Sequence, residues 1–427
     1  MSCKSSALCL FDEQDVQTDI TGTVITDYHP VHTLTAGGPI EFLILGTGDE
    51  YIDLGDLRLL VRLKIIKKDG KAWNSTADKV NFVNLPLSSI FQDVFMSIND
   101  TQVEGGQHLY PYNGYISTLL QFHPSAKQTH LQAWGWNEDT PGKFNDDKNE
   151  GLKFRRAETD SGKVWEIMGP LFLDLTRQPR YLLPHTNLRL KLLPATSEFA
   201  LQSTGSYDDF KFSIEKCVLY APRISVLNSV VAGHNKGLEK FNAQYHLNHV
   251  DITTFNLEKG NRSFIKDGLF KSQVPKMIVV GLLDHAAFNG NIKKSPFNFK
   301  HYNLNKIGLY RDGELTPGQI FTPDYANDHF TRSYNHTMDA LNYFNTDDSN
   351  GMTMEHFKDG YNLYAFDLTP DGSNQGQHRH LIRSGSVRLE LNFEKVLSKP
   401  ITVMLFGILD AKLEITKLRE VIMSYSR

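Results

Sequence analysis

SVRLELNFEKVLSKPITVMLFGILD, residues 386–410, is the stretch that decides the fold. Its first eight residues alternate between polar and apolar side chains, with the apolar set on one face: Val387, Leu389, Leu391 and Phe393. A period of two is typical of a half-buried strand. Residues 401–409 form an uncharged apolar run, short enough for a strand buried on both faces. The stretch therefore predicts two neighbouring strands.

The chain upstream has the same character. VPKMIVVGLLDHAAFNG begins at Val274, and IGLY at 307–310 runs into a hairpin signal at Asp312-Gly313. Asp-Gly favours a tight hairpin because both turn positions need positive φ. Two segments are helix-like, residues 112–122 and 225–241, and two read as long exposed polar loops, residues 139–163 and about 323–360. Further strands are predicted at residues 40–45, 57–66, 94–98, 165–175, 188–193, 210–219 and 245–255.

Short segments in the two halves of the sequence are similar to each other. FLDLT at 172–176 matches AFDLT at 365–369, and NLRLKL at 187–192 matches SVRLEL at 386–391. The segment that ends at Asp100 runs parallel to the one that ends with Asp312-Gly313. The three matches occur in the same order and indicate a duplicated β unit. They predict that Asp174 corresponds to Asp367, and Arg189 to Arg388.

A duplicated antiparallel unit predicts an all-β protein, a double jelly roll. It has two eight-stranded antiparallel β-sandwiches in tandem, with short helices in the loops and the linker. The expected organisation is an N-terminal arm at 1–38 without periodicity, a first jelly roll at 39–224, a linker at 225–243, and a second jelly roll with a C-terminal tail at 244–427.

Composition narrows the function. The formal net charge of the 427 residues is −4, and the first 29 residues are acidic, which predicts no specific nucleic-acid binding. Three cysteines, Cys3, Cys9 and Cys217, form no disulfide framework and indicate a reducing compartment. No apolar stretch approaches the ~18–20 residues of a membrane span.

The sequence predicts no catalytic, cofactor-binding or metal-binding residues. Cys3 and Cys9 lack the second ligand pair of a zinc site. His246 and His249 point to opposite faces of a predicted strand. Asp367 and Asp371 could form a glycosidase-like carboxylate pair. The favoured interpretation of Asp367 is an aspartate that ends a strand and binds turn amides.

Several segments carry a resemblance to a known family: GPIEFLILGTGDEYIDL, LLVRLKIIKKDG, YPYNGYISTLL, MGPLFLDL, VPKMIVVGLLDHAAFNG, SPFNFKHYNL, NLYAFDLTPD and RSGSVRLEL. In this order they resemble the major capsid protein of Maverick/Polinton-type DNA transposons and adintoviruses. The resemblance spans residues 40–413, most of the chain. It implies a double jelly roll that forms homotrimeric, pseudo-hexagonal capsomers of an icosahedral shell.

The resemblance also implies a structural protein rather than an enzyme. Its partners would be copies of itself, neighbouring capsomers and a pentameric single jelly-roll minor capsid protein at the vertices. Its location would be the virion capsid, after synthesis in the host cytoplasm and assembly inside the host cell. The polar loops at 139–163 and 323–360 would form outward towers that clasp neighbours. The alternative function is a two-jelly-roll glycan-binding protein or a glycoamidase-like enzyme.

Overall fold

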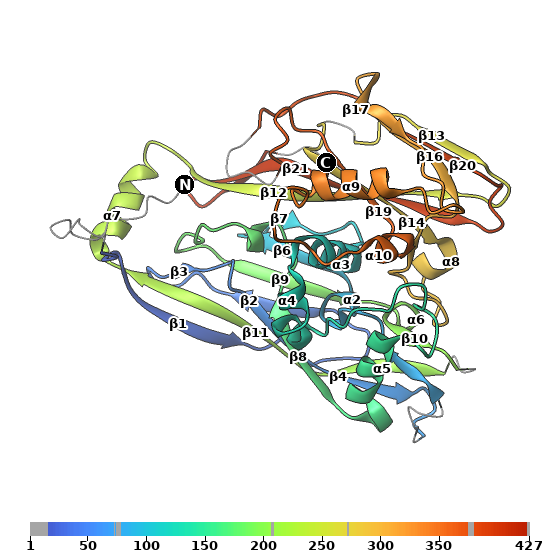
Figure 1. Cartoon of the computed structure of the whole chain (residues 1–427). Coiled ribbons are helices and arrows are strands. Elements are labelled where there is room, and N and C mark those ends of the chain that lie inside the picture. The colour runs from blue at the N-terminus through green and yellow to red at the C-terminus, as the bar shows by residue number, and fades with distance from the viewer. Residues whose placement is uncertain are drawn as a thin grey trace, which may run out of the picture.

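The structure, a computed structural model, describes residues 16–71, 73, 78–205, 209–270, 273–374 and 380–424. Two β-sandwiches dominate it. In Figure 1 the first sandwich, blue to green, lies below the second, yellow to red. Helix α7 (Asn228–Gly237) lies between them in the sequence, within the predicted helix-like segment.

The first sandwich consists of two antiparallel sheets. One has the strand order β1-β11-β4-β8, and the other has the order β2-β9-β6-β7. Short β3 (Tyr51–Ile52) pairs with β11 at the end of the first sheet. The bounds are β1 Ile20–Tyr28, β11 Phe210–Val226, β4 Arg58–Lys67, β8 Trp165–Pro170, β2 Ile40–Ile44, β9 Leu188–Pro194, β6 Phe91–Ile98 and β7 Thr101–Glu104.

The second sandwich repeats this order strand for strand. Its sheets run β12-β21-β14-β19 and β13-β20-β16-β17, with β22 (Val421–Met423) paired to β21. The bounds are β12 Ala243–Leu257, β21 Ile401–Ile415, β14 Met277–Asp284, β19 Leu363–Asp367, β13 Ser263–Lys266, β20 Val387–Phe393, β16 Leu304–Arg311 and β17 Glu314–Phe321. The predicted double jelly roll and its duplication are therefore confirmed.

Strand register agrees with the NLRLKL/SVRLEL match. Arg189 and Arg388 are each the second residue of their strand, β9 and β20. The residue before each arginine pairs with the last residue before a hairpin turn: Leu188 with Ile98, and Val387 with Arg311. A slip of one residue would turn the buried Leu188, Leu190 and Leu192 outward, at about 1.5–3 kcal/mol for each side chain.

The two hairpin turns also correspond. Positive φ angles occur at Asn99 (46°) and Asp100 (66°) in the first sandwich, and at Asp312 (52°) and Gly313 (85°) in the second. Both turn positions are thus left-handed, as the Asp-Gly signal predicted. Asn99 rather than Asp100 corresponds to Asp312, so the sequence match was displaced by one residue.

The match between Asp174 and Asp367 is wrong. Asp367 is the last residue of β19 and pairs with Met277, the first residue of β14. The first residue of β4, Arg58, pairs instead with Pro170, four positions before Asp174. β8 ends at this proline, which has no N–H to continue the ladder. FLDLT therefore follows its strand, whereas the first three residues of AFDLT lie inside theirs.

The predicted arm at 1–38 contains a strand. β1 pairs with β11 from Ile20 to Tyr28, so the expectation of an arm without regular structure is wrong for these nine residues. Both expected exposed loops are also wrong in part. Residues 139–163 contain α5 (Glu150–Glu158), and residues 323–360 contain α9 (Thr331–Ala340) and α10 (Met354–Lys358).

The remaining elements connect the strands. No helix in the described ranges is both long and apolar enough to cross a membrane. The connecting elements are α2 Pro86–Ser89, α3 Tyr110–Gln121, α4 Pro124–Lys127, α6 Ser197–Ala200, α8 His285–Phe288, η1 His130–Trp134, η2 Asp160–Gly162, η3 Leu175–Arg177, β5 Val80–Phe82, β10 Leu201–Ser203, β15 Phe299–Lys300 and β18 Asp359–Gly360.

Candidate functional site: the junction of the two sandwiches

Helix α3 of the first sandwich carries aromatic side chains into the second. Tyr115 stacks on Phe297 with ring centroids 4.2 Å apart, and Tyr112 stacks on Phe288 at 5.7 Å. Both tyrosines are buried. The two tyrosines therefore pack between the sandwiches and not inside one of them. Aromatic contacts of this kind add to the hydrophobic stabilisation of the junction.

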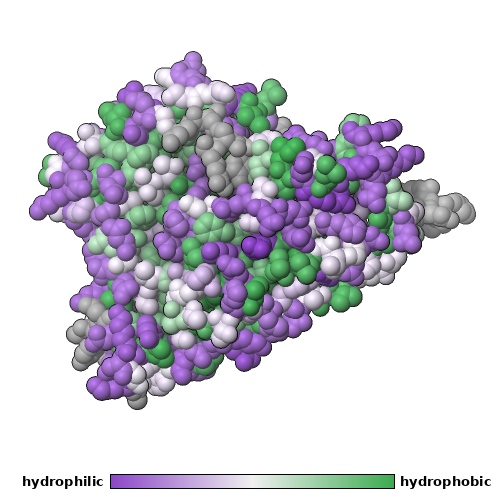
Figure 2. Space-filling model, turned by 180° about the vertical axis from the view of Figure 1, so that it is seen from behind, coloured by the Kyte–Doolittle hydropathy of each residue, from purple (hydrophilic) through white to green (hydrophobic). Residues whose placement is uncertain are grey.

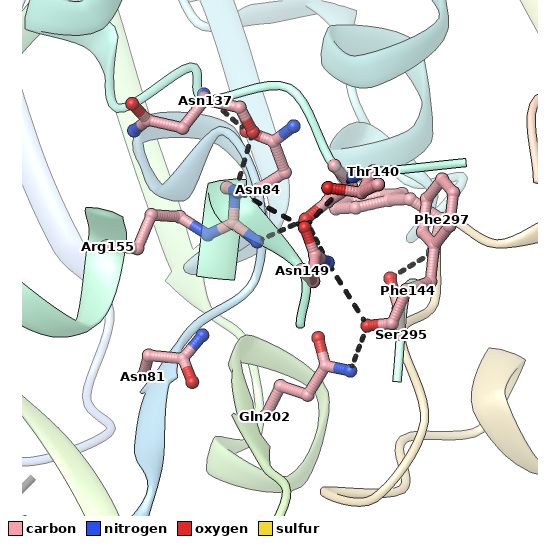
Figure 3. Close-up of polar contacts among 12 residues, drawn as sticks. Asn81, Asn84, Asn137, Thr140, Phe144, Asn149, Arg155, Gln202, Ser295 and Phe297 are labelled. Carbon is pink, nitrogen blue, oxygen red and sulfur yellow. Dashed lines mark hydrogen bonds and ion pairs between the residues drawn. The ribbon is translucent and has the colours of Figure 1, made fainter. Parts of the chain in front are cut away.

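A buried ion pair organises the polar segment around α5. Arg155 has no exposed surface, and its Nη2 donates to Asp139 Oδ1 at 2.6 Å. Its other donors bind the carbonyl oxygens of Phe82 (3.0 Å) and Asn137 (2.7 Å). Figure 3 shows Arg155 beside Asn84 and Asn137. Asn149, the N-cap of α5, donates to Asp139 at 2.8 Å. A buried charge pair needs hydrogen-bond partners for its remaining polar groups, and each of the three guanidinium nitrogens of Arg155 has an acceptor.

The same segment is hydrogen-bonded to the second sandwich. Tyr361 donates from its hydroxyl to the carbonyl oxygen of Asp139 at 2.5 Å, and Ser295 N donates to Asn145 Oδ1 at 2.7 Å. In Figure 3, Ser295 and Phe297 lie beside Phe144. Residues 139–163 thus contact the second sandwich of the same chain.

A buried lysine makes a second link. Lys127 Nζ donates to the carbonyl oxygens of Leu119 in the first half and Asn350 in the second, each at 2.6 Å. Burial disfavours the charged ammonium and lowers the pKa of Lys127 to about 8. The two hydrogen bonds of Lys127 Nζ join the two halves of the chain inside the junction.

The outer edge of β12 faces the first sandwich and is covered by it. Asp174 Oδ1 accepts from Val250 N at 3.2 Å, and Arg180 Nη1 donates to the carbonyl oxygen of Gln244 at 2.5 Å. The hydroxyl of Tyr245 accepts from Leu183 N and donates to the carbonyl oxygen of Tyr181. Asp174, Arg180, Tyr181 and Leu183 all belong to residues 171–187, which connect β8 to β9. This connection satisfies backbone groups that an edge strand otherwise leaves open.

A cleft of about 710 Å³ opens at this junction, lined by both halves. Glu104, Asp174 and His249 lie together in its wall. His249 Nδ1 lies 2.6 Å from Asp174 Oδ2. The two carboxylate oxygens of Glu104 accept from the backbone N–H groups of Asp174 and Leu175, each at 2.7 Å. Glu104 therefore holds the 171–187 connection in place.

Burial shifts the protonation of this cluster. Burial and the negative charge of Asp174 raise the pKa of Glu104 to about 8. Burial alone would lower the pKa of His249, but the hydrogen bond and charge of Asp174 outweigh it and raise that pKa above its usual value. The cluster thus favours a proton on Glu104 near neutral pH, and the charge of Asp174 favours the imidazolium form of His249.

Among the residues that the sequence analysis considered as candidate sites, His249 belongs to this cluster and Asp367 lies outside it. Asp367 accepts from Thr369 N at 2.8 Å and from Asn374 Nδ2 at 2.6 Å, which confirms it as a turn-binding aspartate. Cys3 and Cys9 lie outside the described residues. Within the described ranges, no group of three or more His, Cys, Asp or Glu side chains could hold a metal ion. Sequence reasoning missed the Glu104–Asp174–His249 cluster because its members come from three separate elements.

No family model matches the sequence. The chain is 25% identical over 390 residues to the uncharacterized protein F54H12.2 of Caenorhabditis elegans, with 89% of this chain and 91% of that protein covered. Among solved structures, it is similar to a chain of the Sputnik virophage, with a TM-score of 0.64, 13% identity, and coverage of 99% of this chain and 92% of that chain.

Two further structures have the same fold. One is a chain of the PBCV-1 virus capsid, with a TM-score of 0.60 and 9% identity over 98% of this chain and 100% of that one. The other is the mavirus major capsid protein, with a TM-score of 0.56 and 11% identity over 98% of this chain and 93% of that one. The chain has the double jelly-roll fold of viral capsid proteins.

Proposed function

We propose that this protein is a major capsid protein whose homotrimers form pseudo-hexagonal capsomers of an icosahedral shell. The observation that carries the proposal is the repeated strand order of the two sandwiches, fixed to each other by a buried junction. Three such subunits offer six similar sandwiches, which suits hexagonal packing. The fold shared with capsid proteins over nearly the whole chain supports this role.

The Maverick/Polinton and adintovirus assignment belongs to the same proposal. It is supported by the ordered sequence segments between residues 40 and 413. A nematode relative of similar extent is compatible with a capsid gene carried in animal genomes. In such a shell, a pentameric single jelly-roll minor capsid protein would close the vertices, and the protein would reside in the virion capsid after assembly in the host cell.

The proposed role requires a trimer. Purified protein should sediment at about three times the subunit mass of 48.5 kDa and show a hexagonal outline in negative-stain microscopy. A protein that stays monomeric at micromolar concentration and forms no shell with its vertex partner would overturn the proposal.

The alternative, a glycan-binding protein or glycoamidase-like enzyme, would use the cleft at the junction. The cleft has a suitable size and carries Glu104 and Asp174 in its wall. However, both oxygens of Glu104 bind backbone N–H groups, so its carboxyl is engaged in structure. Glycan-array binding or glycoamidase turnover that is lost on substituting Asp174 would favour the alternative.

A further inference from the structure

The two sandwiches differ in how the outer edges of their corresponding strands are covered. β1 holds the same place beside β11 that β12 holds beside β21. The edge of β12 is covered by the 171–187 connection of the first sandwich. Among the described strands, only β11 pairs with β1, and Figure 1 shows no strand beyond it.

The open edge of β1 has no protective charge over most of its length. From Ile20 to Thr26 the strand reads ITGTVIT, without lysine, proline or an acidic residue. Val24 and Ile25 point to opposite faces, and they are 60% and 56% exposed. In the turned view of Figure 2, apolar side chains appear along the lower right, the side on which β1 lies. Natural edge strands of this kind are usually shielded by another segment.

The second sandwich has a connection that corresponds to the one covering β12. Residues 368–386 connect β19 to β20, as residues 171–187 connect β8 to β9. In the first connection, Leu182 and Leu183 are buried at the junction. In the second, Leu381 is 85% exposed and Ile382 is 57% exposed. One connection thus covers an edge, whereas the corresponding one presents apolar side chains to solvent.

We propose that the outer edge of β1 binds residues 380–386 of a second copy of this chain, the described part of its β19–β20 connection that precedes β20, with Leu381 and Ile382 packed beside Val24 and Ile25. The contact between copies would repeat the contact that already exists inside each copy, between the 171–187 connection and β12. This inference rests on the proposed capsomer. It identifies the surfaces through which its subunits join.

The geometry of this contact favours a ring. Each copy offers an open edge on one sandwich and an exposed connection on the other, so the contact is head-to-tail. Head-to-tail contacts form a closed ring when the rotation closes. Because the internal junction and the junction between copies would be similar, the sandwiches would alternate around the ring. Pairing of β1 with the β1 of another copy would instead give a two-fold dimer and leave Leu381 exposed.

Site-specific crosslinking tests the contact. The full chain would carry Cys3→Ser and Cys9→Ser, with Val24→Cys and Leu381→Cys, and would be treated with a short bismaleimide. We expect covalent dimers and trimers on a denaturing gel, and no larger product. The matched control pairs Leu381→Cys with Phe154→Cys, at an exposed residue of α5, and should give at most background crosslinking.

The outcomes separate this inference from the proposed function. A trimer that forms without a crosslink between positions 24 and 381 would overturn the contact and leave the capsomer proposal standing. Crosslinking of Val24→Cys alone would support the two-fold dimer and overturn the contact. Failure of the unsubstituted chain to form any trimer would overturn the capsomer itself.

A charge substitution gives an independent measurement. Val24→Lys should raise the trimer dissociation constant by about tenfold or more, because a lysine on an edge strand opposes pairing. Val164→Lys, at an exposed residue outside both surfaces, is the control and should leave the constant unchanged. Both variants should unfold at the same temperature as the unsubstituted monomer. An unchanged constant for Val24→Lys would contradict the proposed contact.

Discussion

β12 and β1 are corresponding strands in two sandwiches with the same strand order, yet they have different surroundings. Val250 in β12 is 6% exposed and its N–H is bound by Asp174, whereas Val24 in β1 is 60% exposed. The 171–187 connection covers the outer edge of β12, and among the described strands only β11 pairs with β1. A duplicated unit joined in tandem can cover one of its two equivalent edges internally. The other edge is left for a separate molecule.

The internal junction predicts the largest effect. Arg155→Ala removes one partner of a fully buried ion pair and leaves Asp139 without its charge partner. We expect a loss of about 3–5 kcal/mol in the free energy of unfolding, measured by urea denaturation. Lys153→Ala, an exposed residue on the same helix, should change it by at most about 0.5 kcal/mol. Equal effects of the two substitutions would contradict the structural role of Arg155.

The covered edge should be more sensitive to side-chain loss than the open edge. Asp174→Ala removes the acceptor for Val250 N and the partner of His249, at an expected cost of about 2 kcal/mol. Asp27→Ala, on the open strand, should leave the unfolding of the monomer unchanged, since this side chain is exposed. Comparable losses at both positions, measured by chemical denaturation, would show that β1 is not an open edge.

The same contrast should hold for apolar packing, with a smaller effect. Val250→Ala should cost about 1.5 kcal/mol, because two buried methyl groups are lost. Val24→Ala should change monomer stability by at most about 0.5 kcal/mol. This comparison requires thermal unfolding of each variant at a protein concentration low enough to keep the chain monomeric. A larger loss at Val24 than at Val250 would reverse the assignment of the two edges.

The stability of the junction should also depend on pH. The pKa of Glu104 is raised to about 8, so between about pH 4.5 and 8 the folded state holds a proton that the unfolded state has released. This stabilising contribution is fully present below about pH 4.5 and is lost as the pH rises through about 8. The raised pKa of His249 acts in the same direction.

The slope that Glu104 contributes should be at most about 1.4 kcal/mol per pH unit. Denaturation of the unsubstituted chain and of Glu104→Gln at pH 6 and pH 9 isolates this contribution. The substituted chain should lose less stability between the two values. Identical slopes would show that Glu104 keeps an ordinary pKa.

Sequence periodicity predicted those strands that have one buried face and one partly exposed face. β20 alternates strictly between buried and half-buried residues, and its register followed from that pattern. β1 was missed because its side chains have no buried face to impose alternation. Asp139, Asn149 and Arg155 were read as an exposed loop because hydropathy cannot show that polar side chains satisfy one another. The cleft cluster needed the three-dimensional arrangement, since Glu104, Asp174 and His249 are far apart in the sequence and come together only in the folded chain.

The hydrogen bond between Tyr361 and Asp139 has a consequence for synthesis of the chain. The two residues are 222 positions apart, so at 5–20 residues per second a ribosome delivers Tyr361 about 10–45 s after Asp139. Until the second sandwich is made, Tyr115 lacks Phe297, and residues 139–163 lack the contacts with Ser295 and Tyr361. Nascent chains arrested before residue 285 should therefore bind an apolar dye that completed chains exclude. The junction can therefore be completed only after the second sandwich has been synthesised, and a subunit is ready to join a shell only after that step.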